Sequence, residues 1–133
     1  MPQLPVDQFY LYMKHLLSGL IMVGLFAAVY VRFTPFHEMP LIRRGCTAAA
    51  LSLAGAIVGF SLTVASSILH NDHYLMFVAW GTLAAVVQVA AYLLIERSLP
   101  EMKAAIEANN MAMGALMGTV SLVVGVINAA CLS

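Results

Sequence analysis

The sequence predicts an all-α integral membrane protein with four transmembrane helices, and three observations support this fold class. Apolar residues make up 62% of the 133 residues and charged residues only 9%, against roughly 25% charged residues in an ordinary soluble domain. Four long runs carry no charged residue: residues 16–31, 46–69, 74–95 and 111–132. The charges are clustered between these runs. None of these runs alternates apolar and polar residues, as the strands of a membrane β-barrel do.

The length of each run predicts one spanning helix, because a helix needs about 20 mostly apolar residues to cross the hydrocarbon core. The last three runs are long enough alone. The first becomes long enough when it is extended back through residues 9–13, with Lys14 directing its ammonium group toward the headgroups. Residues 1–8 should form a short lead. The first run ends at Arg32-Phe33 without a small-residue cleavage site, so we expect this helix to be retained.

The segments between the runs contain helix-start and turn signals. Thr34-Pro35 predicts a helix start, with Thr34 as cap and Pro35 at the first position, and Pro40 should bend or break that helix. The polar turn at residues 70–73 predicts an antiparallel hairpin. Ser-Leu-Pro-Glu at residues 98–101 fits a capping box, so a further helix should follow it and bend at Asn109-Asn110.

The two halves of the chain are similar, which predicts a duplicated unit within one membrane domain (residues 1–133). At an offset of 64 residues, Ile42 aligns with Ile106 and Ala48 aligns with Ala112. Repeat one would cover about residues 9–70 and repeat two about residues 74–133. Because each repeat holds two spanning helices, both copies should have the same orientation across the membrane, as two tandem parallel helical-hairpin repeats.

The positions of lysine and arginine predict the orientation. The two connections at one end of the helices carry most of these residues: Arg32, Arg43, Arg44, Arg97 and Lys103. The opposite end carries Lys14. By the positive-inside rule the basic connections face the cytoplasm, so both termini should lie outside. The formal net charge is zero, and no basic surface indicates nucleic acid as a partner.

Two Gly-x-x-x-Gly pairs are candidate helix-packing sites, Gly55 with Gly59 and Gly114 with Gly118. Paired glycines allow the backbones of membrane helices to approach closely. The favoured interpretation is packing within the four-helix bundle, because four short helices must pack on something. The alternative is a seam between copies of the chain.

Three amides are candidate buried polar residues: Gln88, Asn110 and Asn128. An amide that faces lipid is costly, so the amides within the helices should face the bundle interior or a neighbouring subunit. They could bond each other, line a pathway or hold a water, with structural bonding favoured. Four hydroxyls at the outer end of the second span could bond the preceding turn or line a hydrated vestibule: Ser61, Thr63, Ser66 and Ser67.

His70, Asp72 and His73 in the outer turn have side chains that bind zinc or sense pH in other proteins. A structural zinc site normally has four ligands and this turn offers three at most, so a solvated polar turn is favoured. Cys46 and Cys131 should lie at opposite faces of the membrane. A disulfide needs Cα atoms within about 7 Å, so both thiols should be free.

The residues at several positions resemble the YjfL-type family of small bacterial inner-membrane proteins. They are Thr34-Pro35, Leu41-Ile42, Thr47-Ala48-Ala49, Gly55, Gly59, Phe77-x-Ala79-Trp80-Gly81, Gln88, Asn110, Met117-Gly118-Thr119, Gly125 and Asn128-Ala129-Ala130-Cys131. That family is built from a paired domain of unknown function, with two transmembrane segments in each copy. Both copies tend to carry Asn-Thr-Ala-Ala; here Cys46 replaces the first asparagine and Met111 replaces the second threonine. The resemblance implies an integral inner-membrane protein and no established activity.

No catalytic constellation is visible in the sequence: it contains no Walker loop, no G-x-G-x-x-G and no H-E-x-x-H. No carboxylate lies deep in a predicted spanning helix, which weakens a proton-coupled transporter interpretation. We therefore expect a non-enzymatic membrane module without a cofactor or metal, which associates with itself or with another membrane protein. The alternative is an oligomeric unit for permeation or transport of small ions or solutes, with Gln88, Asn128 and the hydroxyls of the second span along its path.

Overall fold

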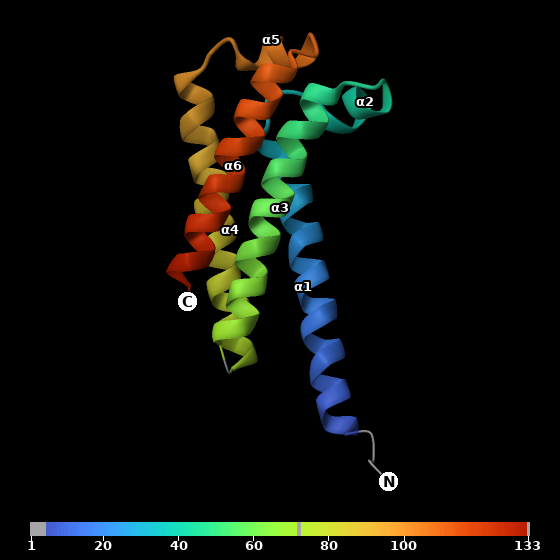
Figure 1. Cartoon of the computed structure of the whole chain (residues 1–133), viewed down its shortest axis with the longest axis vertical. Helices are drawn as coiled ribbons and strands as arrows, with labels where there is room; N and C mark the ends of the chain where they lie inside the picture. The colour runs from blue at the N-terminus through green and yellow to red at the C-terminus, as the bar shows by residue number, and fades with distance from the viewer. Residues whose placement is uncertain (1–4, 72, 133) are drawn as a thin grey trace.

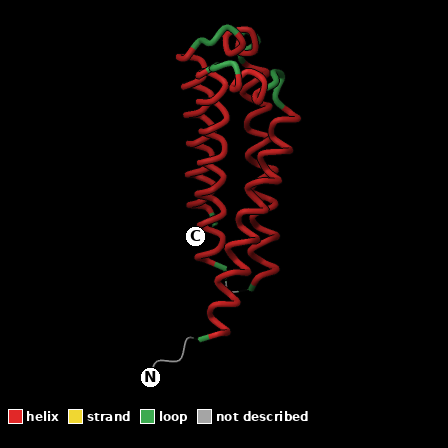
Figure 2. The backbone as a smooth tube through the Cα atoms, turned by 90° about the vertical axis from the view of Figure 1, so that its right-hand side faces the viewer, coloured by secondary structure: helices red, strands yellow, loops and turns green. Residues whose placement is uncertain are grey.

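The computed structural model describes residues 5–71 and 73–132, and it consists of helices joined by short connections. Four helices are long and apolar enough to cross a membrane: α1 (Val6–Phe33), α3 (Thr47–His70), α4 (Tyr74–Ser98) and α6 (Met111–Cys131). Two helices have six residues each, α2 (Glu38–Arg43) and α5 (Met102–Glu107). Within the described ranges no strand is present (Figure 2). The predicted all-α membrane fold is confirmed.

The four long helices form an elongated bundle with both short helices at one end (Figure 1). The turn between α3 and α4 lies at the other end, and α6 ends on that side as well. α3 is the most buried span, with half of its most apolar window inside the protein, whereas only 17% of that window is buried in α1. Stacked rings of Phe26 and Phe60, with centroids 4.3 Å apart, connect α1 to α3.

α1 begins earlier than the sequence predicted, at Val6 directly after Pro5. Proline suits the position before a helix because it loses no intrahelical hydrogen bond there. A helix of 28 residues is about 42 Å long, longer than the hydrocarbon core of about 30 Å. The first turns of α1 accordingly extend beyond the other helices (Figure 1).

The prediction that Thr34 caps a helix beginning at Pro35 is wrong. Thr34 instead follows the last residue of α1, and its hydroxyl donates to the carbonyls of Val31 and Phe36. The next helix begins at Glu38. Pro40 does not break it, because Pro40 occupies the first turn, where the backbone N–H has no intrahelical partner.

The capping box predicted at residues 98–101 does not form. Ser98 is the last residue of α4, and its hydroxyl donates to the Leu94 carbonyl. Glu101 precedes α5 without a side-chain cap. The bend predicted at 109–110 separates α5 from α6, and Asn109 there has a left-handed φ of 60°. Asparagine adopts this conformation more readily than most residues.

Several helix bounds in the two halves differ by 64 residues. α2 begins at Glu38 and α5 begins 64 residues later, at Met102. α3 begins at Thr47 and α6 begins 64 residues later, at Met111. Among the described residues, the positive φ angles at Gly45 and Asn109 have the same offset. The repeat arrangement remains a prediction, and these bounds are compatible with it.

Candidate functional site

The four candidate packing glycines lie on the surface between α3 and α6. A Cβ atom added to Gly55 would overlap the backbone of Gly118, and one added to Gly114 would overlap the backbone of Ala48. A Cβ on Gly59 would lie 2.8 Å from the Ser121 carbonyl oxygen. The two helices therefore touch backbone to backbone, and the glycines serve packing within the chain.

Hydroxyls extend this α3–α6 contact toward the outer end. The Thr63 hydroxyl donates to the Gly125 carbonyl at 3.0 Å, and the Ser66 hydroxyl donates to the Ala129 carbonyl at 2.6 Å. Ser67 donates to the Phe77 carbonyl of α4, whereas Ser61 bonds its own preceding turn. Thr63, Ser66 and Ser67 therefore join helices, whereas Ser61 bonds within α3.

Polar groups connect the start of α3 to α5 and to the connection between α5 and α6. The Cys46 thiol donates to the Ile106 carbonyl at 3.2 Å, and the Asn109 side-chain oxygen accepts the Ala48 backbone N–H at 3.0 Å. Asn110, grouped with the buried amides on sequence, is exposed instead. Its side-chain oxygen caps α6 by accepting the Met113 N–H.

Gln88 and Asn128 bond to backbone carbonyls, and no bond joins one to the other. The Gln88 amide donates at 3.0 Å to the carbonyl of Ser121 on α6 and at 3.4 Å to that of Ala56 on α3. Asn128 donates to the Ala84 carbonyl on α4 at 3.1 Å. Both amides therefore hold α4 against the α3–α6 pair.

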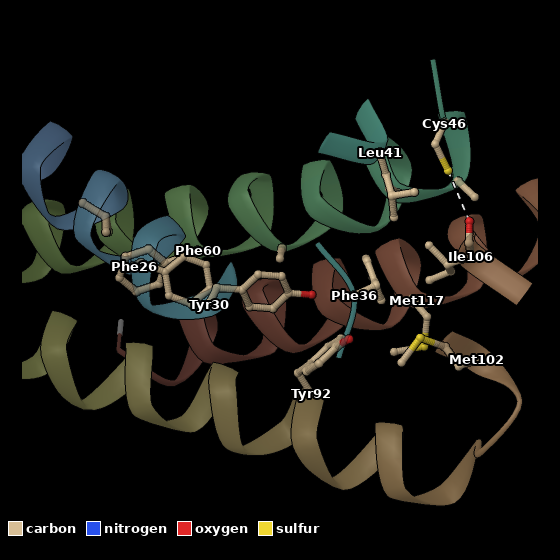
Figure 3. Packing of buried hydrophobic residues seen from close by; sticks show 14 of the residues in the cluster. Phe26, Tyr30, Phe36, Leu41, Cys46, Phe60, Tyr92, Met102, Ile106 and Met117 are labelled. Carbon is tan, nitrogen blue, oxygen red and sulfur yellow. Dashed lines mark hydrogen bonds between the residues drawn. The ribbon is translucent and has the colours of Figure 1, made fainter. Parts of the chain in front are cut away.

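A group of polar side chains lies inside the bundle toward the end that carries α2, and we call it the interior oxygen cluster. Its members are Tyr30, Glu38, Ser52, Gln88 and Tyr92, each at most 3% exposed. The Tyr30 and Tyr92 rings meet edge to face with centroids 5.0 Å apart. Figure 3 shows both hydroxyls directed toward Phe36.

The cluster is connected by electrostatics as well as by proximity. Glu38 interacts with both tyrosines, and the Tyr30 hydroxyl also interacts with Ser52 and with Ser121 of α6. Within residues 5–71 and 73–132, however, neither tyrosine hydroxyl has a partner at hydrogen-bond geometry. Unpartnered buried polar groups are rare in proteins and call for an explanation.

Glu38 is the one charged side chain of this cluster, and it lies on α2 outside the spanning helices. It is 2% exposed, and neither carboxylate oxygen has a hydrogen-bond partner in the described part of the chain. Burial raises the pKa of this carboxyl above its usual range, opposed by the nearby Thr34 hydroxyl. Water solvates a carboxylate much better than this interior does, so burial favours the neutral, protonated form of Glu38.

A groove of about 490 Å³ opens between α1 and α4. Its floor includes Phe26, Phe60 and Gly81, and the exposed side chains of Leu25 and Val86 stand at its sides. The lining is apolar apart from Thr82, whose hydroxyl already donates to the Val78 carbonyl. The groove can therefore accept an apolar occupant without leaving a polar group unpaired.

The outer turn at residues 70–73 is described only in part. His70 is exposed and its ring bonds the Ser66 carbonyl, Asp72 lies outside the described residues, and no cluster of three or more metal-ligating side chains occurs among the residues described. Cys46 is buried, Cys131 is exposed, and no disulfide joins them within the chain, as predicted.

Sequence reasoning missed Glu38 and the two buried tyrosines. A signal was present: Glu38 is the sole acidic residue between Arg32 and Arg44, in a segment that otherwise carries positive charge. Tyr30 and Tyr92 were ordinary apolar-run residues on the sequence. Only the packing of α2 onto the end of the bundle brings these three side chains together.

Comparisons with known proteins agree with this membrane architecture. The family model described as Domain of Unknown Function (DUF350) matches residues 3–132. The UPF0719 inner membrane protein YjfL of Escherichia coli (strain K12) is 30% identical over 128 residues, which cover 96% of this chain and 97% of the relative. The UPF0719 transmembrane protein YshE of Bacillus subtilis (strain 168) is 27% identical over 100 residues, 74% of this chain and 75% of the relative. No solved structure matches.

Proposed function

The chain belongs to the DUF350 family, as its YjfL-type residues predicted, and we propose that it is a non-enzymatic membrane module that associates with a second copy of itself. The observation that carries this proposal is the α1–α4 groove. The glycines that the sequence offered for an oligomer seam are occupied by α3–α6 packing. The groove between α1 and α4 is a large concave surface that the α3–α6 packing leaves open.

A second copy fits the groove because the same surface supplies both the concave and the convex parts. Leu25 is 62% exposed and Val86 is 60% exposed, and both project beside the groove floor. In a two-fold dimer each copy would place such side chains into the groove of the other. Membrane helices associate through this kind of close van der Waals packing, because lipid offers no hydrophobic gain.

The permeation alternative has less support from the geometry. The predicted permeation path is lined by Gln88, Asn128 and the α3 hydroxyls. These side chains donate hydrogen bonds to carbonyls inside the bundle. A group that already donates to the backbone is poorly placed to replace the hydration shell of a solute. We therefore keep permeation as the second candidate, without a defined path.

The proposed location is a bacterial inner (plasma) membrane, supported by the printed name of the Escherichia coli relative. The proposed orientation places α2 and α5 in the cytoplasm and both termini outside. It is supported by the basic residues at that end, which include Arg43, Arg44 and Lys103.

Cysteine crosslinking in native membranes tests the dimer. Val86→Cys and Val123→Cys would each be made in a Cys131→Ser background, which leaves only the buried thiol of Cys46. Val86 lines the groove, and Val123 is a comparably exposed valine on α6 outside it. We expect a crosslinked dimer for the Val86 variant and at least about tenfold less for the Val123 variant, since a disulfide requires Cα atoms within about 7 Å.

If both variants gave only monomer, the proposal would be contradicted. Equal amounts of crosslinked dimer for both variants would also contradict it, because such crosslinks would come from random collisions between chains. A crosslinked product heavier than two copies of the chain would point instead to another membrane protein in the groove. That outcome would replace self-association by partner binding.

A further inference from the structure

The unpartnered atoms of the interior oxygen cluster are of one chemical kind. Across the described ranges, six buried side-chain N or O atoms have no hydrogen-bond partner, and all six are oxygens of this cluster: the hydroxyls of Tyr30, Ser52 and Tyr92, both carboxylate oxygens of Glu38, and the side-chain oxygen of Gln88. Each of these atoms has lone pairs to offer. Oxygen sets of this kind bind hard cations, whereas nitrogen and sulfur sets bind zinc, copper and iron.

The charge of the cluster sets the charge of a suitable ligand. Glu38 contributes one negative charge, and the arginines nearest to it in the sequence, Arg32, Arg43 and Arg44, are exposed. Its other neighbours are the Thr34 hydroxyl and the exposed ring of His37. A buried carboxylate without a counter-charge is costly. One positive charge, carried by a proton or by a cation, balances it.

We propose that the interior oxygen cluster is a binding site for a single alkali-metal cation, held by the Glu38 carboxylate and the neutral oxygens around it. A divalent ion would leave one positive charge uncompensated in a medium of low dielectric constant, and such ions normally take several carboxylates. The second glutamate in the neighbourhood, Glu96, interacts with Tyr30 and Tyr92 and is partly exposed. The site therefore matches one unit charge.

Protons compete with the cation at Glu38. The titratable groups that interact with it are Tyr30 on α1, His37 before α2 and Tyr92 on α4, and Glu96 on α4 interacts with the two tyrosines. The residues contributed by α3 and α6, Ser52 and Ser121, do not titrate. The ion would enter from the aqueous phase at the end of the bundle that carries α2 (Figure 1), and binding should strengthen as the carboxyl loses its proton.

Thermal unfolding of the full chain in detergent tests this site. Circular dichroism would follow unfolding at pH 8 and constant ionic strength, with chloride salts of sodium, potassium or N-methylglucamine. We expect a saturable rise of Tm with sodium or potassium that N-methylglucamine does not produce. At a hundredfold excess over Kd, the folding equilibrium constant should rise about 100-fold.

Three variants make the test specific. Glu38→Gln should abolish the cation effect, and Glu101→Gln, an exposed glutamate before α5, should preserve it. Tyr92→Phe keeps the ring and loses one oxygen, so its apparent cation affinity should fall at least about tenfold. The tyrosine variant keeps the proposal testable if Glu38→Gln does not fold.

Equal Tm values of the wild-type protein in all three salts would overturn the proposal and leave Glu38 as a protonated carboxyl. Equal sodium responses of the wild type and Glu38→Gln would do the same, because the effect would then be one of salt in general. A saturable response to magnesium or calcium alone would overturn the assignment to a monovalent ion. None of these outcomes bears on the crosslinking result, so the two proposals fail separately.

Discussion

At the scale of single residues, the position of each glycine decides what it does. Gly55 lies within the backbone contact between α3 and α6, where a methyl group would overlap Gly118. Gly24 on α1 is exposed, and a Cβ atom there would have nothing within 4 Å. The two residues are equivalent by type and opposite by environment, so they form a matched pair for mutagenesis.

Gly55→Ala should lower the stability of the folded chain by about 1–3 kcal/mol, because overpacking displaces backbone that cannot move independently. Gly24→Ala should change stability by less than about 0.5 kcal/mol, as exposed substitutions usually do. Thermal unfolding of both variants in the same detergent measures the difference. Equal unfolding temperatures would contradict the backbone contact between α3 and α6.

At the scale of helices, the least predictable element is α2. Thr34-Pro35 has the local sequence of a helix start, yet the helix begins at Glu38, because Phe36 is buried and the Thr34 hydroxyl bonds the Phe36 carbonyl. Tertiary packing overrides local propensity here. The resulting short helix inserts a carboxylate into the bundle, which no rule based on charge alone would predict.

The buried position of Glu38 makes the packing of α2 sensitive to pH. Its pKa in the folded chain is raised above the ordinary value of 4.5, so folding takes up a proton. The stabilising contribution is complete below the ordinary pKa, and it is lost as the pH rises toward and through the raised folded value. The loss amounts to about 1.4 kcal/mol for each unit by which the folded pKa exceeds the unfolded one.

In N-methylglucamine buffer without sodium or potassium, the wild-type Tm should therefore fall between pH 5 and pH 8. Glu38→Gln removes the titrating group, so its Tm should depend much less on pH, whereas Glu107→Gln, an exposed change on α5, should behave like the wild type. Parallel pH profiles for the wild type and Glu38→Gln would show that another group is responsible.

Much of the helical architecture was predictable, and the candidate sites were only partly so. The four spans follow from hydropathy, because uncharged runs of this length have no alternative location in a small protein. Small-residue patterns at Gly55, Gly59, Gly114 and Gly118 identified the packing surface but not its partner helix. Gln88 was predictable as a buried amide, but the bond from the Ala48 N–H to the Asn109 side-chain oxygen depends on how two distant segments meet.

At the scale of the whole molecule, the bundle contains a tightly packed helix pair, α3 with α6, and a loosely packed pair, α1 with α4. α3 and α6 touch through their backbones, whereas α1 and α4 leave a groove of about 490 Å³ between them. Most of the surface of α1 faces outward. α3 and α6 form the closely packed part of the bundle, and α1 and α4 offer the surface that we assign to a second copy.

The orientation of the whole molecule can be tested by its C-terminus. Alkaline phosphatase, which is active only outside the cytoplasm, should be active when fused after the last residue, and a fluorescent protein that folds only in the cytoplasm should be dark there. Fusions within the connection between α2 and α3 should give the reverse result. A bright cytoplasmic reporter at the C-terminus would refute the orientation drawn from Arg43, Arg44 and the other basic residues.

Self-association is tested most directly by counting copies of the chain in lipid bilayers. Fluorescently labelled protein would be reconstituted at decreasing protein-to-lipid ratios, and photobleaching steps counted for the wild type, Ala90→Phe and Ala115→Phe. Ala90 lines the groove, and Ala115 is an exposed alanine on α6 outside it. We predict two-step bleaching for the wild type and Ala115→Phe, and a dimer weakened about tenfold for Ala90→Phe, since interactions between membrane helices contribute about 1–2 kcal/mol. Single-step bleaching of the wild type at every ratio would contradict the account.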